Sequence, residues 1–309
     1  FLGTELAGYF PLPLQERYAD LIPDHRLRRE IVATQVTNSL VNRMGITFVL
    51  RMREDTGASP EQLARAYTIA RELLDARDFW RRVEALDNKV DASLQNEALL
   101  IMWEQLRKFT RWLANLSGQE LSIEAMIARL QPGFQAMQKV LYGRLDESEQ
   151  AAVQQLELHF VEGGFPKRFA RRLALLSQLF PLLDVVETAA AGDFDVLQVA
   201  DVYRGLGDSL GLKWLRTEVE RLRVAGQWHA HARGNLRDEL YAQHRGLVDS
   251  AIATCGLDDD PVPGWLEQHR EDVRRVTEMM EDMRNLKAMD YATASVAIRS
   301  LGQLLVAAS

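Results

Sequence analysis

The sequence predicts an all-α fold, a multi-helix bundle of stacked helical hairpins with no significant sheet. Apolar residues recur at helical spacing through most of the chain, and Asp, Ser, Pro and Gly residues mark helix starts and ends between these segments. Residues 46–50 are the best candidate for a strand, and a single strand cannot pair its own backbone groups. These observations together favour helices throughout.

The stretch from Asp24 to Gly45 is the first clear helix. Asp24, directly after Pro23, is the expected N-cap, and Gly45 stands where a left-handed residue commonly ends a helix. Two apolar faces predict that this helix packs between two layers. Its stripes are Leu27, Ile31, Thr34, Asn38 and Val41 on one side, and Val32, Val36 and Leu40 on the other.

Asn38 lies within one of these stripes. Because a buried amide must find hydrogen-bond partners, one interpretation is that Asn38 ties the helix to a neighbouring backbone or side chain. The other interpretation is a polar residue tolerated at a partly wet edge. The sequence leaves both open.

Two further helices follow directly. For the first, the stretch Ile46–Leu50 either continues as a helix or turns; we favour a helix to about Glu54, which Thr56-Gly57 then breaks. Ser59, Pro60 and Gln62 then form a capping-box pattern, with proline at the first helical position. A helix is therefore expected to begin there and to run to about Leu74.

Three more helices complete the first half of the chain. They are expected to begin at Asp78, near Val90 and at Ser122. The second of them should end at Ser117-Gly118. Pro132-Gly133 should kink or break the third, because proline removes a helical hydrogen bond.

The second half continues in the same way. A helix begins near Asp146 and ends at Gly163-Gly164. This double glycine is the expected boundary between an N-terminal helical subdomain, residues 1–163, and a C-terminal one, residues 164–309; the alternative is one continuous domain. Later helices are expected to begin at Pro166, Pro181, Asp195, Gly211 and Gly226, and a loop over residues 257–264 precedes the last two.

Composition restricts the class of protein. The chain has 309 residues, a formal net charge of −7 and one cysteine, Cys255. A single cysteine allows no intrachain disulfide and suits a reducing compartment, so a cytoplasmic location is expected. No apolar run reaches the ~18 residues of a membrane span and no basic-then-apolar leader is present, so no membrane association is expected.

Nucleic acid is not an expected partner either. The net charge is negative, and the two basic runs, His25–Arg29 and Lys167–Arg172, carry no recognisable nucleic-acid fold signature. We interpret both runs as solvated or ion-paired faces of amphipathic helices.

A dinucleotide-binding loop is the first chemical pattern to consider. Gly205, Gly207 and Gly211 come nearest to it, but the third glycine is one position late and the preceding segment has a helical pattern. We interpret these glycines as allowing close helix contact and a turn. NAD is therefore not expected to bind here.

Metal and general-base chemistry have weak signals. His229 and His231 are two residues apart, so on a helix they point in different directions and cannot share a metal with His244 and Cys255. His159, flanked by acidic residues, is interpreted as a surface histidine. The sequence assigns no catalytic, cofactor-binding or metal-binding residue.

Extended sequence patterns carry a family resemblance. In order, they are YFP at Tyr9–Pro11, HRLRREI at His25–Ile31, N-x-x-x-NR-x-G at Asn38–Gly45 with Phe48, EDTGAS at Glu54–Ser59, LLDVVETA at Leu182–Ala189, VYRGLGDSLGLKWL at Val202–Leu215 and WHAHARGNLRDELY at Trp228–Tyr241. Over about residues 9–241 the chain thus resembles the C-terminal helical region of the large bacterial NAD-specific glutamate dehydrogenases.

The resemblance implies one piece of a multidomain enzyme, outside its catalytic domain. The parent enzyme would oxidatively deaminate glutamate to 2-oxoglutarate and ammonia with reduction of NAD. The implied partners are the catalytic domain of the same chain and further copies in a homo-oligomer. Glutamate dehydrogenases need an activated lysine in a glycine-lined cleft, and the six lysines here lie in helical contexts. This part alone is therefore expected to be non-catalytic, supporting the catalytic domain, oligomer assembly or regulation.

The expected interdomain contacts are polar residues on or just before the first clear helix: His25, Arg28, Arg29, Asn38, Asn42 and Arg43. An alternative function is a stand-alone small-molecule effector-binding module, with a ligand in a helical crevice near Arg28 or Arg168. A third class is a helical enzyme of unrecognised type, which would need a buried ionisable cluster in a deep pocket.

Overall fold

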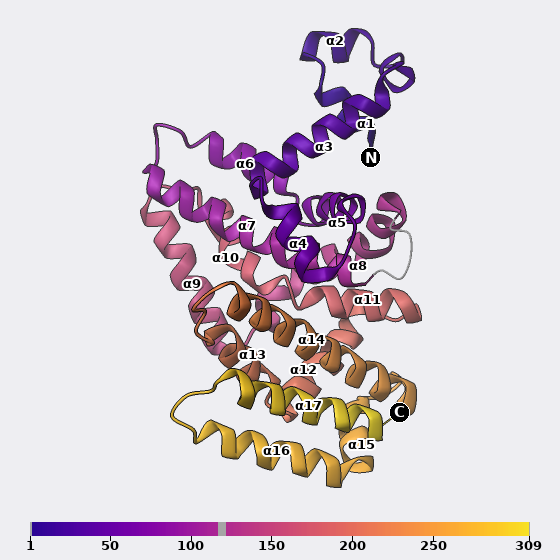
Figure 1. Cartoon of the computed structure of the whole chain (residues 1–309), viewed down its shortest axis with the longest axis vertical. Helices are drawn as coiled ribbons and strands as arrows, with labels where there is room; N and C mark the ends of the chain where they lie inside the picture. The colour runs from indigo at the N-terminus through magenta and orange to yellow at the C-terminus, as the bar shows by residue number, and fades with distance from the viewer. Residues whose placement is uncertain (1, 117–121, 309) are drawn as a thin grey trace. The chain divides into compact units, whose positions relative to one another are not determined.

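A computed structural model describes residues 2–116 and 122–308, and these residues form helices, turns and loops without a strand (Figure 1). The predicted all-α class is confirmed. Ile46–Leu50, the best strand candidate, leads into a helix that begins at Phe48.

The chain groups into two compact units. Unit 1 comprises Phe1–Pro132 and Val140–Phe180, and unit 2 comprises Gly133–Lys139 and Pro181–Ser309. Gly163 and Gly164 form the turn between two helices within unit 1. The subdomain boundary at this double glycine stays a prediction.

Unit 1 is built from consecutive short and medium helices, with the buried α5 packed against α7 at its centre. Its elements are α1 (Leu2–Gly8), α2 (Leu12–Arg17), η1 (Ile22–Asp24), α3 (Arg28–Met44), α4 (Phe48–Thr56), α5 (Pro60–Leu73), α6 (Ala76–Glu84), α7 (Ala92–Asn115), α9 (Glu147–Glu162), α10 (Lys167–Leu175) and η2 (Leu176–Gln178), together with the ends of α8 (Ile123–Arg144).

Unit 2 is organised around its longest helix, α14, which packs against α11, α12, α13, α15 and α17. Figure 1 shows α14, α17 and α16 in succession, and the contacts between neighbours agree. The elements are α11 (Leu182–Gly192), α12 (Val196–Ser209), α13 (Leu212–Arg221), α14 (Gln227–Cys255), α15 (Pro261–Gln268), α16 (Arg270–Arg284) and α17 (Tyr291–Ala307).

Local capping signals are confirmed where the capping side chain is near in sequence. Ser59 Oγ accepts from the Gln62 backbone N–H at 3.2 Å, and Gln62 Oε1 accepts from the Ser59 N–H at 2.8 Å. Asp146 and Glu149 form a second capping box. Such caps satisfy N–H groups that a helix leaves unpaired and each contributes about 1 kcal/mol.

The predicted start of α3 is wrong, whereas the prediction that its two faces are both contacted agrees with the structure. The helix begins at Arg28 rather than after Asp24, because residues 22–24 form a separate 3₁₀ turn. Ile31, Leu40 and Met44 are buried, whereas Asn38 is exposed. Ile31 belongs to one predicted apolar stripe and Leu40 to the opposite one, so each of the two faces is covered in part, by α1 and by α5 and α7. The structure supports the wet-edge interpretation of Asn38. The helix does end at Gly45, whose φ is +92°.

Three smaller expectations also differ. The helix expected at Asp78 begins at Ala76, because Asp75 turns the chain in a left-handed conformation. Helix α8 continues through Pro132, so the predicted break is absent, and the alternative of a kink stays a prediction. The loop predicted over residues 257–264 is shorter, since α15 begins at Pro261 with Asp260 as its N-cap. The helix end predicted at Ser117-Gly118 lies outside the described residues.

No single helix among the described residues is long and apolar enough to cross a membrane. Two consecutive helical segments, Lys167–Gln178 and Leu182–Gly192, meet the length and composition requirement only as a bent pair.

Candidate functional site

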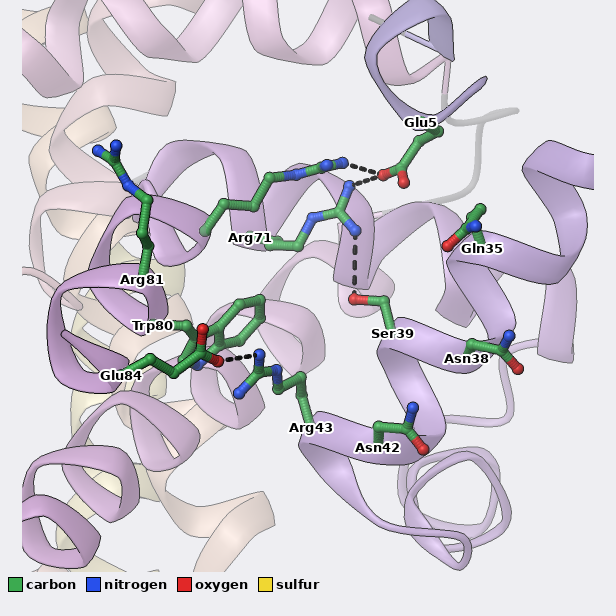
Figure 2. Close-up of a pocket in the computed structure, with 11 residues that line it drawn as sticks. Glu5, Gln35, Asn38, Ser39, Asn42, Arg43, Arg71, Trp80, Arg81 and Glu84 are labelled. Atoms are coloured by element: carbon green, nitrogen blue, oxygen red, sulfur yellow. Dashed lines mark hydrogen bonds and ion pairs between the residues drawn. The ribbon is translucent and has the colours of Figure 1, made fainter. Parts of the chain in front are cut away.

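Four helices of unit 1 surround a pocket of about 460 Å³. Helix α1 contributes Glu5 and α5 contributes Arg71, while α3 and α6 form the two longer walls (Figure 2). The complete lining is Glu5, Gln35, Asn38, Ser39, Asn42, Arg43, Arg71, Arg77, Trp80, Arg81 and Glu84. We refer to it as the arginine pocket.

Helical periodicity explains why α3 and α6 line the arginine pocket. On α3 the lining positions include residues 35, 38, 39 and 42, and on α6 they are residues 77, 80, 81 and 84. Both sets follow the i, i+3, i+4, i+7 spacing of one helix face. The opposite faces carry the apolar residues that hold the helices in unit 1, including Leu40 on α3 and Phe79 on α6.

The most buried contact of the pocket is a carboxylate that two arginines share. Glu5 Oε1 accepts hydrogen bonds from Nη2 of Arg71 and from Nη2 of Arg77 (Figure 2). The side chains of Arg71 and Glu5 are 1% and 5% exposed, so their charges are shielded from water. Glu72 completes the cluster, with its Oε1 3.1 Å from Arg71 Nε and 3.4 Å from Arg77 Nε. A buried guanidinium is tolerated only with such partners.

Ser39 links this cluster to the core of unit 1. Its Oγ accepts from Arg71 Nη1 at 3.3 Å and lies 3.1 Å from the hydroxyl of Tyr67. Burial raises the pKa of Tyr67 above its usual value, so its hydroxyl stays protonated at neutral pH and serves as a fixed polar partner.

The opposite end of the pocket is closed by Arg43. Its Nη2 donates to Glu84 Oε1 at 2.9 Å, and its guanidinium carbon lies 4.5 Å from the Trp80 ring centroid. A cation over an indole face is attracted by the ring's negative face. Arg43 therefore connects α3 to α6 by both charge and stacking.

Asp78 lies outside the pocket lining and holds one lining residue, Arg81, together with two further arginines. It accepts from Arg82, Arg81 and Arg172, and these hydrogen bonds, led by that from Arg82, hold the pKa of its carboxyl well below the usual range. Arg172 also donates to the Asp75 carbonyl at 2.8 Å, which ties α10 to the start of α6.

The chemistry of this lining suits anion binding. Four arginines face two glutamates, and the remaining polar groups are three amides and one hydroxyl. The lining contains no histidine, cysteine or lysine, and its Ser39 and two glutamates are hydrogen-bonded to arginines. The arrangement can orient a negatively charged group by paired guanidinium donors.

Half of the six predicted contact residues line the arginine pocket. Asn38, Asn42 and Arg43 do so, although the interdomain role assigned to them stays a prediction. Sequence patterns did not predict three other lining residues, Arg71, Arg77 and Trp80. The helical spacing of residues 77, 80, 81 and 84 could have predicted a polar face on this helix. It could not have predicted which helix packs opposite that face.

The other three predicted residues lie at the start of α3. His25 Nδ1 accepts from the Leu27 N–H at 3.1 Å, and the His25 ring packs edge-on against Phe10 at 5.5 Å. Arg28 donates weakly to the Pro23 carbonyl at 3.4 Å. Arg29 is exposed. This region is separate from the arginine pocket.

Exposed apolar side chains surround that region. Helix α2 has no buried residue, and most large apolar side chains on α2 and on the turns before and after it are exposed to solvent. A six-residue helix without a buried face is not stable by itself. We call this surface the N-terminal face; it consists of Tyr9, Leu12, Leu14, Tyr18, Leu21 and Leu27, which are 39 to 70% exposed.

Unit 2 contains a buried polar cluster around His244. Arg216 Nη2 donates to His244 Nδ1, and the Tyr203 ring centroid lies 3.7 Å from that of His244. Burial, followed by the charge of Arg216, lowers the pKa of His244 well below its usual value. Nearby, Asp184 is 2% exposed and pairs with Arg245 at 3.3 Å.

The glycine pattern on α12 has the structural role that the sequence predicted. A Cβ at Gly205 would lie 3.0 Å from Val262 Cγ2, and a Cβ at Gly207 would lie 3.2 Å from His244 Cε1. Both glycines sit inside α12, and Gly211 turns the chain into α13 with φ of +68°. These glycines allow helices of unit 2 to approach closely.

The four residues once considered for a metal do not converge. His229 is exposed and packs near Tyr291, His244 is buried, and Cys255 is exposed. Among residues 2–116 and 122–308, no group of three or more His, Cys, Asp or Glu side chains is placed to hold a metal ion. His159 is a surface residue paired with Glu97 at 3.0 Å.

The fold and the arginine pocket define an all-α domain with one polar, cation-rich recess on unit 1. Comparison with known proteins adds its family. The family described as "Glutamate dehydrogenase, C-terminal" matches residues 1–303. The chain belongs to this family, and the resemblance seen in the sequence is confirmed.

Three curated relatives, each called NAD-specific glutamate dehydrogenase, are similar over nearly the whole chain. The Pseudomonas aeruginosa protein is 34% identical over 98% of this chain and 19% of its own length. The Halomonas elongata protein is 35% identical over 96% of this chain and 18% of its own length. The Mycobacterium tuberculosis protein is 32% identical over 98% of this chain and 19% of its own length. The chain thus spans about one fifth of the length of these relatives.

Proposed function

We propose that this chain is the C-terminal, non-catalytic helical domain of an NAD-dependent glutamate dehydrogenase. The parent enzyme converts L-glutamate, NAD⁺ and water to 2-oxoglutarate, ammonium, NADH and a proton. The observation that carries the proposal is the match of nearly the whole chain to a C-terminal family whose relatives are about five times as long. The domain supports the catalytic domain and the assembly or regulation of a homo-oligomer in the cytoplasm.

In this proposal NAD and glutamate bind elsewhere in the parent chain. A Rossmann-type site needs a strand, a glycine-rich loop and a helix, so that backbone N–H groups can approach the pyrophosphate. The nearest glycine pattern here lies within α12 and faces Val262 and His244. This arrangement supports assigning the cofactor to another domain.

The N-terminal face is our candidate for the contact with the catalytic domain of the same chain. Its apolar side chains would be covered, and His25, Arg28 and Arg29 beside it would supply polar contacts at the rim. The occupant is argued from the relatives, in which about four fifths of the length lies outside the matched region. An exposed apolar patch bordered by charges is typical of an interface.

The test uses the parent chain truncated before Phe1. NAD-dependent glutamate oxidation is measured for the truncated chain, with and without this 309-residue chain added in trans, and for the added chain alone. Restoration by the added chain, with no activity from that chain alone, is the expected result. Full activity and normal assembly of the truncated chain would refute the supporting role.

An effector-binding module is the second candidate function. The arginine pocket favours it, although the ligand site lies at Arg43, Arg71, Arg77 and Arg81 rather than near Arg28 or Arg168. Its test is direct binding of a small anion to the chain, which needs no catalytic domain.

A further inference from the structure

The carboxylate of Glu5 lies between two arginines, Arg71 and Arg77, that other helices of unit 1 hold in place. Arg71 comes from α5 and Arg77 from α6, and Ser39 and Glu72 hold Arg71 in place from α3 and α5. The carboxylate bound between the two guanidinium groups comes from α1, 66 residues before Arg71. Arg71 and Arg77 therefore already bind a carboxylate, and that carboxylate belongs to a different helix, α1.

We propose that the arginine pocket binds a small carboxylate-bearing metabolite, whose carboxylate replaces that of Glu5 between Arg71 and Arg77 and releases α1. This inference rests on the effector-binding candidate and does not require the proposed docking of the N-terminal face. No covalent bond changes; one carboxylate exchanges for another.

Charge balance favours a carboxylate over a phosphate. Replacing the Glu5 carboxylate by another carboxylate keeps one negative charge between the two guanidinium groups. A phosphate would add charge close to Glu72, which already lies 3.1 Å from Arg71 Nε. The added negative charge and the Glu72 carboxylate would both lie next to Arg71, which is 1% exposed, and like charges repel strongly where water is excluded.

The remainder of the pocket can hold the rest of such a molecule. Gln35, Asn38 and Asn42 follow one face of α3, and none of these three amides has a hydrogen bond to another described residue. Amides can donate to and accept from a ligand's polar groups. Arg43 also lines the pocket, with its guanidinium directed to Glu84 and Trp80 (Figure 2), so a second carboxylate would bind there in competition with Glu84. A dicarboxylate, with one carboxylate at Arg71 and Arg77 and the other at Arg43, is therefore the class of ligand that we propose.

Helix α1 has few other anchors. Leu6 packs with Ile22 and Ile31 in a small apolar cluster, to which Ala7 and Phe10 add partial cover. A small apolar cluster and one ion-pair site are weak restraints compared with the core of unit 1. Loss of the Glu5 interaction should therefore make α1 detach more often from the rest of unit 1. Ligand binding would then control whether α1 is attached.

The probes are succinate and glutarate, titrated into the full 309-residue chain at constant ionic strength, with inorganic phosphate as the comparison anion. Calorimetry measures binding, and hydrogen exchange follows the backbone amides of residues 3–8. Glu5→Gln vacates the arginine site, Arg77→Gln removes a donor, and Arg65→Gln on α5, outside the pocket, is the matched control. Circular dichroism checks that each variant remains helical.

A dicarboxylate should bind saturably and increase hydrogen exchange in α1. Glu5→Gln should bind it about tenfold more tightly, because the site no longer has to be vacated first. Arg77→Gln should bind about tenfold more weakly and Arg65→Gln like the original chain. The proposal is overturned if neither the original chain nor Glu5→Gln binds a dicarboxylate, if phosphate alone binds, or if binding leaves α1 exchange unchanged.

Discussion

The guanidinium of Arg43 lies 4.5 Å from the centre of the Trp80 ring, which places a residue of α3 over a residue of α6 at one end of the arginine pocket. The same guanidinium donates to Glu84 at 2.9 Å. Trp80 is 7% exposed, so its ring gives a fixed surface on which the longer Arg43 side chain rests. This stacked pair sets the separation of the two helices that form the pocket walls.

Replacing Arg43 by alanine should lower the free energy of unfolding by about 1 kcal/mol. The loss combines a partly exposed cation–π contact with an exposed ion pair. Arg43→Lys should lose less, because it keeps the charge while giving up the planar stacking group. Urea unfolding measures the difference, with Arg51→Ala on the neighbouring α4 as an exposed control. Equal losses for Arg43→Ala and Arg51→Ala would show that the stacking contributes nothing.

The buried His244 should make unit 2 sensitive to acid. Its folded-state pKa is lowered by burial and by Arg216, so the unfolded chain binds a proton more readily than the folded one below about pH 6.5. Stability is then unaffected by this group at higher pH and falls as pH drops through 6.5, by at most about 1.4 kcal/mol per pH unit. Tyr203 and Tyr241 do not contribute there, because burial raises their pKa values.

The measurement is the free energy of unfolding between pH 7 and pH 5 for the original chain and for His244→Gln. The variant should be less stable at pH 7 but should lose less on acidification. His159→Gln is the matched control, because His159 is half exposed and paired with Glu97. An identical pH slope in the original chain and His244→Gln would contradict a neutral, buried His244.

Two glycines should respond in opposite ways to alanine. Gly57 ends α4 in the left-handed region with φ of +72°, where an L side chain is strained, so Gly57→Ala should cost about 1 kcal/mol. Gly143 lies in the last turn of α8 with open space where a Cβ would be, so Gly143→Ala should stabilise by about 0.5 kcal/mol. Chemical unfolding compares the two, and a same-sign change would contradict these backbone assignments.

Local signals predicted the helices well where the deciding atoms are close in sequence. Ser59 and Asp146 cap helices through residues three positions later, and Gly57 needs only its own backbone angle. The start of α3 is an exception, because the local contact found there is not one of the usual capping patterns. The His25 side chain accepts the Leu27 N–H, and the chain turns once more before the helix begins at Arg28.

The candidate site was predictable in part for a related reason. Asn38, Asn42 and Arg43 were selected from α3 alone, and they do line one wall of the pocket. The other wall depends on α6 lying opposite α3, and the deepest contact joins Glu5 to Arg71 across 66 residues. Helical periodicity does not predict which distant helices pack together, so the arginine pocket could be identified only from the structure.

The most direct test of the proposed supporting role is the affinity between this chain and the parent enzyme truncated before Phe1. The original chain is compared with a Leu21→Glu, Leu27→Glu variant, which puts charge on the N-terminal face, and with Leu158→Glu, an equally exposed leucine on α9. We expect measurable binding, which the double variant weakens at least about tenfold and Leu158→Glu leaves unchanged. No binding by the original chain, or equal binding by all three, would contradict the proposed supporting role.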